Sequence, residues 1–304
     1  MAAPPSGEQF TISGGGYEAT AVEVGGGLRT LTLAGRPPLD GYGEAEMCDG
    51  GRGQHLVPWP NRIQDGRYEF GGREHELALT EPARGNAIHG LLRWVAWRRV
   101  EQRADRLRLA QRVHPQPGYP FRLDVEVEYR LGEGGLEVRT RAVNSGDAAC
   151  PYGAGAHPYL TAGGDAVDGC RLRLPAASRL AADERGIPTG AEPVAGTEYD
   201  FREGREIGAI RLDTAYADLE PDEAGNVRVE LSGPAGVVTL WMDASHRYVM
   251  LFTGDTLRPE RRRRGVAVEP MTCTPNAFRS GEGLVVLQPG EAAESAWGIS
   301  GRPA

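Results

Sequence analysis

The fold is decided by residues 122–131, RLDVEVEYRL. Apolar side chains at positions 123, 125, 127, 129 and 131 alternate with charged ones at the positions between them. Successive side chains of a β-strand point to opposite faces of the sheet, so a period of two over this length predicts a strand with one face buried and the other in water.

The same alternation recurs in three other stretches: DRLRLAQRV (105–113), GLEVRTRAV (135–143) and NVRVELSG (226–233). The turn GEGG at 132–135 joins two of these strands as a hairpin loop would. Consecutive half-exposed strands are typical of antiparallel sheets that pack face to face. No capped amphipathic helix, fixed-period repeat or linker interrupts them. The sequence therefore predicts an all-β protein, one large antiparallel β-sandwich domain over residues 1–304, with residues 165–205 irregular and containing short strands.

Composition excludes several classes of mechanism. All 34 basic residues are arginines, which excludes Schiff-base and P-loop chemistry that needs lysine. A net charge of −8 argues against nucleic acid as a partner, because such binding needs a basic face. The run RPERRRRG at 258–265 is the local exception. We expect it to be a solvated loop, with an anion contact near Glu269 as the alternative.

The cysteines and the N-terminus favour a protein of the cytoplasm. The four cysteines show no CxxC pair, so neither a zinc site nor a disulfide framework is indicated, and we expect free thiols. The N-terminal residues lack the basic and apolar regions of a signal peptide. No apolar stretch approaches the roughly 18 residues of a membrane helix. We expect a cytoplasmic location and no membrane partner, while the sequence gives no indication of oligomeric state.

Five stretches carry polar residues that a plain sandwich does not require. They are PWPNRIQDG (58–66), NAIHG (86–90), GAHPYL (155–160), RLDTAYADL (211–219) and AVEPMTCTPNAF (267–278). Two of them share a pattern, because His157 and Glu269 each precede a proline, which favours extended backbone at the residue before it. Both side chains are therefore expected on a strand or at a strand end.

Glu269 and His157 together form a candidate acid/base pair. Glu269 follows the apolar residues of GVAV, where burial would raise its pKa towards that of a general base. Histidine has an ordinary pKa of about 6.5, which suits proton transfer near neutral pH. Taken singly, these residues fit structural roles as well. Glu269 could pair with an arginine, His157 or His89 could be hydrogen-bonded in the core, Asp213 could cap a turn, and Trp59 could simply pack.

The five stretches in this order and spacing resemble the aldose 1-epimerase (galactose mutarotase) family from about Tyr42 to the end of the chain. The resemblance implies a galactose mutarotase-like β-sandwich that interconverts the α and β anomers of a free aldose. It implies Glu269 as the general base that takes the anomeric hydroxyl proton and His157 as the general acid at the ring oxygen. Asn61, Arg62, His89 and Asp213 would hold the sugar, and no metal or organic cofactor is implied.

The sequence also departs from the better-studied galactose mutarotases. HGLLRWVAW (89–97) replaces their glycine-rich run, Asp213 is followed by TAY, and PMTCTPNAF (270–278) lacks their glutamine. The resemblance therefore does not specify the sugar. Three alternatives remain: a non-catalytic sugar-binding sandwich, a hexose-6-phosphate mutarotase, and a metal-dependent β-barrel enzyme using His89, His157 and a carboxylate.

Overall fold

Two large antiparallel sheets form the body of the protein, which a computed structural model describes over residues 3–304. The nine-stranded sheet has the order β19 (Arg205–Glu206), β16 (Arg171–Arg173), β21 (Val227–Gly233), β22 (Gly236–Met242), β26 (Ala292–Pro303), β12 (Gly135–Asn144), β11 (Leu123–Gly132), β10 (Arg106–Val113), β9 (Arg98–Gln102). The eight-stranded sheet has the order β18 (Pro188–Pro193), β17 (Ala176–Ala182), β20 (Asp213–Leu219), β23 (Tyr248–Phe252), β24 (Val266–Met271), β14 (Gly155–Ala156), β4 (His55–Leu56), with β15 (Tyr159–Leu160) also pairing with β24.

Smaller elements surround these sheets. The strands among them are β1 (Gln9–Gly14), β2 (Tyr17–Val22), β3 (Leu28–Leu33), β5 (Arg62–Gln64), β6 (Arg67–Phe70), β7 (Arg73–Glu76), β8 (Asn86–Ile88), β13 (Cys150–Tyr152) and β25 (Val285–Leu287). The helices of the described residues are short: α1 (Ala277–Ser280) and the 3-10 turns η1 (Pro82–Arg84), η2 (Val167–Gly169) and η3 (Pro259–Arg261). None of these helices is long and apolar enough to cross a membrane.

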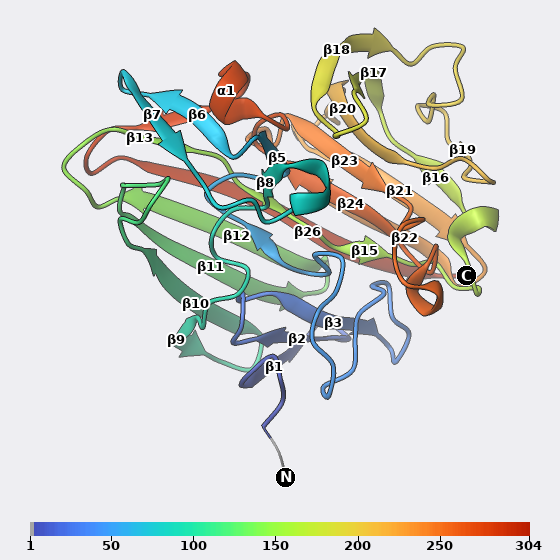
Figure 1. The fold of residues 1–304 in the computed structure, drawn as a ribbon. Coiled ribbons are helices and arrows are strands. Elements are labelled where there is room, and N and C mark those ends of the chain that lie inside the picture. Colours follow the sequence, from blue (N-terminus) through green and yellow to red (C-terminus); the bar gives the residue numbers. More distant parts are fainter. Residues whose placement is uncertain (1–2) are drawn as a thin grey trace.

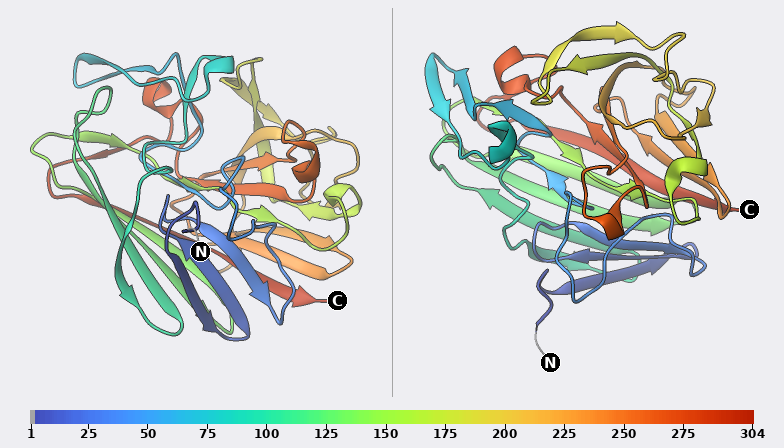
Figure 2. Two further views of the ribbon diagram at one scale, coloured as in Figure 1. Left: turned by 60° about the horizontal axis from the view of Figure 1, so that its bottom comes forward. Right: turned by 45° about the vertical axis from the view of Figure 1, so that its right-hand side comes forward.

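The sheets pack around one large apolar core, and a separate smaller cluster includes Leu180, Met250 and Met271. Figure 1 shows the nine-stranded sheet running diagonally behind the strands of the eight-stranded sheet, with β1, β2 and β3 beneath, and Figure 2 shows the same layers from two other directions. Val127 of β11, Leu240 of β22 and Val268 of β24 belong to the same buried cluster and are all fully buried. The predicted all-β class and antiparallel β-sandwich are confirmed.

The stretch RLDVEVEYRL forms β11 as expected. Its apolar residues are buried and the charged ones between them are at least partly exposed. β11 pairs with β12 from Leu123 opposite Asn144 to Gly132 opposite Gly135, which confirms the hairpin at GEGG. Residues 165–205 contain η2 and the strands β16, β17 and β18, and two of these strands are longer than expected, at six and seven residues.

The arginine run is not simply the solvated loop that we expected. Arg261 is only 8% exposed and Arg263 is mostly buried. Arg261 pairs with Glu46 at 2.8 Å, and Arg263 pairs with Asp168 at 2.6 Å and Asp255 at 3.0 Å. Paired charges can be buried where isolated ones cannot, so these carboxylates draw the run against the body of the protein.

The register of β24 positions the site. Gly155 of β14 lies opposite Met271, and Tyr159 of β15 lies opposite Ala267. His157, midway between β14 and β15, therefore falls opposite Glu269, midway along the facing stretch of β24. The backbone N–H of Val268 donates to the carbonyl of Pro158 at 3.1 Å, which continues the ladder past this point. His157 and Glu269 thus face each other across adjoining strands. Each precedes a proline, and they are 112 residues apart in the chain.

Candidate active site

The site centres on a buried contact between a carboxylate and an imidazole. The Nε2 atom of His157 lies 3.2 Å from Oε1 of Glu269. The two residues are 4% and 2% exposed, respectively. No arginine lies within ion-pair distance of Glu269 in the described residues, so the structural alternative of a Glu269–arginine pair does not hold.

Burial dominates the electrostatics of Glu269. Desolvation raises its pKa well above the usual value, the negative charge of Asp213 raises it further, and the positive charge of Arg62 acts in the opposite direction. The Oε2 atom of Glu269 is buried and has no hydrogen-bond partner among the described residues. A carboxyl with one unpartnered oxygen in an apolar strand has the properties required of a general base.

His157 experiences the opposite shift. Burial lowers its pKa to about 3, with further lowering by the charges of Arg52 and Arg93. Because burial favours the neutral form of each group, the unliganded pair holds one proton over a wide range of pH. Either Glu269 is protonated and His157 neutral, or Glu269 is ionised and His157 is an imidazolium. These are the two states between which an acid/base reaction would move the pair.

A glycine-rich loop at residues 49–54, DGGRGQ, packs against the His157 ring. A Cβ atom on Gly51 would lie 2.5 Å from Cδ2 of His157, so only glycine fits there. The backbone N–H of Gly53 donates to the carbonyl of His157 at 2.9 Å, and the N–H of His157 donates to the carbonyl of Gln54 at 3.1 Å. These contacts fix both the backbone and the ring of His157 before any ligand binds.

His89 and Asn61 hold each other in place beside this pair. Both have positive φ, 63° and 54°, and they exchange two hydrogen bonds. The N–H of His89 donates to the carbonyl of Asn61 at 2.9 Å, and the N–H of Asn61 donates to Nδ1 of His89 at 3.2 Å. Because Nδ1 accepts, neutral His89 carries its proton on Nε2. Its ring packs edge-on against His157 at 5.4 Å, so His89 can offer an N–H donor to a ligand.

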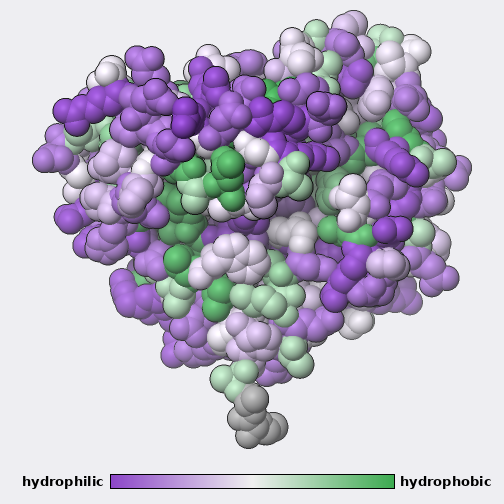
Figure 3. Space-filling model, viewed as in Figure 1, coloured by the Kyte–Doolittle hydropathy of each residue, from purple (hydrophilic) through white to green (hydrophobic). Residues whose placement is uncertain are grey.

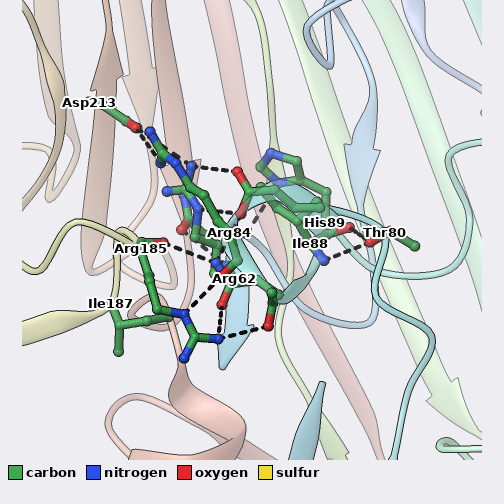
Figure 4. A network of polar contacts seen from close by, with 12 residues as sticks. Arg62, Thr80, Arg84, Ile88, His89, Arg185, Ile187 and Asp213 are labelled. Carbon is green, nitrogen blue, oxygen red and sulfur yellow. Dashed lines mark hydrogen bonds and ion pairs between the residues drawn. The ribbon is translucent and has the colours of Figure 1, made fainter. Parts of the chain in front are cut away.

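Arg62 is the centre of a charged network next to His89 (Figure 4). It binds Glu81 through two hydrogen bonds of 2.8 and 3.1 Å and lies 3.5 Å from Asp213. Arg84 also reaches Asp213, at 3.1 Å. Burial alone would lower the pKa of Arg62, but Glu81 and Asp213 raise it above the usual value, so Arg62 stays charged. Asp213, at the start of β20, and Arg84 are each about one third exposed, so this side of the network is open to solvent.

The structure therefore brings all six sequence-predicted residues into one neighbourhood. Sequence reasoning missed four charged residues: Arg52, Glu81, Arg84 and Arg93. The three glycines in DGGRGQ were a signal for Arg52, because a loop this rich in glycine indicates close backbone packing. No sequence signal distinguished Glu81, Arg84 or Arg93 from other surface charges.

The same residues bear on whether a metal could bind. Among the described residues, one ligand atom from each of His89, His157 and Glu269 lies within 4.8 Å of the others. The positive charges of Arg62 and Arg93 are close enough to lower the pKa of His89 and would also repel a dication. This repulsion favours proton chemistry over a metal centre, and the absence of a metal cofactor stays a prediction.

The face that Figure 3 shows is largely hydrophilic, with hydrophobic patches near its middle.

The sequence matches the aldose 1-epimerase family over residues 8–300. The chain belongs to this family. It is 35% identical to the uncharacterized protein YihR of Escherichia coli K12 over 288 residues, which is 94% of this chain and 91% of that protein. It is 33% identical to the galactose mutarotase of Mus musculus over 163 residues, covering 50% of this chain and 46% of the mouse protein.

The fold is also that of solved epimerase homologues. The GalM/aldose epimerase homologue from C. elegans superposes with a TM-score of 0.86 at 20% identity, covering 97% of this chain and 99% of that one. The resemblance inferred from five motifs is thus confirmed, and the similarity begins before Tyr42, where the motifs had placed its start.

We expect Gly51→Ala to lower activity more than its backbone strain explains. The new methyl would displace the His157 ring, and the positive φ of 76° adds about 1–2 kcal/mol of strain. Gly196→Ala is the matched control, because Gly196 has a φ of 75° and open space around it. In thermal unfolding, Gly196→Ala should lose only the backbone energy, and Gly51→Ala should lose this energy plus the cost of moving the ring. Equal activity in the two variants would contradict a steric role for Gly51.

We expect stability to depend on pH through Glu269. Its folded-state pKa is raised, so its contribution to stability is complete below the unfolded pKa of about 4.3 and is lost as pH rises towards the folded value. The Tm of Glu269→Gln relative to the wild type should therefore increase as pH rises above about 4.3. Exposed Glu69→Gln should show no such trend. A difference for Glu269→Gln that stays constant with pH would contradict the raised pKa.

Proposed function

We propose that this protein is a mutarotase that interconverts the α and β anomers of a free aldose by acid/base ring opening, within a single domain and without a metal or organic cofactor. The observation that carries the proposal is the 3.2 Å contact between Glu269 and His157 in a buried site. The anomeric oxygen and the ring oxygen of an aldose are bonded to the same carbon. One base and one acid this close together can therefore reach both oxygens of one sugar.

The reaction begins with Glu269 ionised and His157 protonated. Glu269 takes the proton of the anomeric hydroxyl while His157 donates a proton to the ring oxygen, and the bond between C1 and the ring oxygen breaks. The open aldehyde rotates about the C1–C2 bond. The former ring oxygen, now a hydroxyl, attacks the other face of C1 while His157 takes back its proton. Glu269 returns its proton to the aldehyde oxygen, which becomes the new anomeric hydroxyl. The pair ends as it began, with one proton.

The remaining residues would position the sugar. His89 offers Nε2–H, Arg62 offers guanidinium donors, and Asp213 offers carboxylate acceptors that pair with alternating sugar hydroxyls. Asn61 acts at one remove, because its backbone fixes His89 and its Oδ1 accepts the N–H of Arg62 at 3.0 Å. Their mutual contacts preorganise the site, so a sugar binds without rearranging them.

Two competing functions make different predictions. A sugar-binding protein without catalysis would hold the same sugars but leave their rate of mutarotation at the buffer value. A hexose-6-phosphate mutarotase would act on the phosphorylated sugar and be poorly inhibited by the free one. The presence of both members of the acid/base pair favours catalysis, and substrate competition separates free from phosphorylated sugars.

Glu269→Gln should lose nearly all catalysis. Removing a positioned general base costs about 10² to 10⁴-fold in rate, and His157→Asn should cost a similar factor. Because the two residues act as a unit, the double variant should be no worse than the poorer single one. Polarimetry of freshly dissolved α-glucose, α-galactose and pentoses measures the effect, with Glu69→Gln as the control. Full activity in Glu269→Gln would refute the mechanism, and a wild type no faster than buffer with any free sugar would refute the proposed substrate class.

Removal of divalent metals should leave the rate unchanged. We expect protein dialysed against a chelator to mutarotate its sugar at the rate of untreated protein, and elemental analysis to find no stoichiometric zinc or iron. Loss of activity on chelation and its return with one metal would instead establish the His89, His157 and Glu269 cluster as a metal centre.

A further inference from the structure

Arg52 is a buried cation whose contacts do not account for its burial. Its side chain is 1% exposed, yet none of its three nitrogens makes a hydrogen bond within residues 3–304. Its charge is opposed by Asp40 at 3.3 Å and Asp49 at 3.7 Å. A buried ion pair without hydrogen bonds often fails to repay its desolvation, and replacing such a pair with apolar side chains is often neutral or stabilising. The burial of a charged side chain at this position therefore points to a use of the charge itself.

Arg52 is stacked in line with the proposed acid. Its guanidinium lies over the Tyr159 ring at 4.1 Å, and that ring stacks on the His157 ring at 5.0 Å with only 12° between the planes. The Tyr159 hydroxyl donates to the carbonyl of Gly50 at 2.8 Å, which ties the ring to the loop that carries Arg52. The Nε2 atom of the same His157 ring lies 3.2 Å from Oε1 of Glu269.

We propose that Arg52 is a positioning residue of the active site, which clamps Tyr159 against His157 and whose positive charge repels a proton from the His157 ring. Arg62 acts on Glu269, the other member of the pair, because the charge of Arg62 favours the ionised form of Glu269. The two arginines thus oppose each other, Arg52 favouring neutral His157 and Arg62 favouring ionised Glu269. The charges of the two arginines therefore favour opposite one-proton states of the pair.

Other charged and titratable groups face His157 as well. They are Glu269 of β24, Tyr159 of β15, His89 after β8, and Arg93 from the loop that follows His89. Arg93 also disfavours protonation of His157, but it is not in the stack, and its guanidinium donates to the carbonyl of Ile88 at 3.3 Å. Arg52 differs from Arg93 in reaching the imidazole through a single aromatic ring.

The role assigned to Arg52 in catalysis rests on the proposed mutarotase function, but its effect on His157 can be measured without a substrate. NMR titration of the histidine rings in the full-length protein gives the apparent pKa of His157, and His157→Asn assigns its signals. Arg52→Met should raise that pKa by about one unit, since the two stacking distances place the charge at most about 9 Å from the ring. Arg52→Lys, which keeps a charge and loses no hydrogen bond, should restore most of the shift.

Arg261→Met is the matched control. Arg261 is 8% exposed and also approaches Asp40, at 4.0 Å, but it does not touch Tyr159. This variant should lose stability and leave the pKa of His157 unchanged. If Arg52→Met does not fold because Asp40 is left unpaired, the double variant Arg52→Met/Asp40→Asn removes both charges and serves the same titration.

The outcomes separate the two proposals. In a folded Arg52→Met or double variant, an unchanged pKa of His157 overturns the role of Arg52, whether or not the wild type is a mutarotase. A raised pKa that Arg52→Lys reverses supports it, even if no tested sugar is turned over. If the wild type is active, Arg52→Met should change kcat by up to about tenfold, matching one pH unit, with KM nearly constant, and Arg52→Lys should restore the wild-type kcat. A change in KM alone would mean that Arg52 acts on binding and would also overturn the proposal.

Discussion

The contact between Glu269 and His157 constrains most of what surrounds it. A carboxyl and an imidazole in an apolar interior are each costly in their charged form, and sharing one proton is the arrangement that avoids two isolated charges. Their separation is set by backbone register rather than by flexible side chains, because β14 and β15 pair with β24 on either side of the contact. The geometry is therefore as rigid as the eight-stranded sheet itself.

This rigidity explains why the arginines near the site are paired as they are. Arg62 is held by Glu81 and Asp213, and Arg52 by Asp40 and Asp49. Neither guanidinium forms a direct ion pair with Glu269, and such a pair would hold that carboxylate ionised and lower its pKa. Both arginines are therefore paired with carboxylates other than Glu269.

Much of the fold was readable from the sequence, because alternation on half-exposed strands is a local signal. The alternation within residues 122–131 predicts both a strand and the face of that strand that is buried, and no other segment is needed for this prediction. The site was readable only in part. His157 and Glu269 could be singled out by the proline that follows each of them, but their facing each other depends on a register that pairs residues 112 positions apart. Pairing between distant strands is a property of the whole sheet and leaves no mark on either segment alone.

The sequence failed to predict burial for two sets of arginines, the arginine run and Arg52. A run of four consecutive arginines predicts a solvated loop, yet Arg261 is buried and Arg263 is mostly buried. Both pair with carboxylates from distant segments, Glu46 and Asp168 among them. A single arginine between glycines does not by itself predict burial, yet Arg52 is the most buried of the charged residues near the site. In both cases the deciding quantity is the local balance of charge after folding. Composition gives the number of charges. Only the packing of the sheets determines which of these charges lie close enough to the Glu269–His157 pair to affect its protonation.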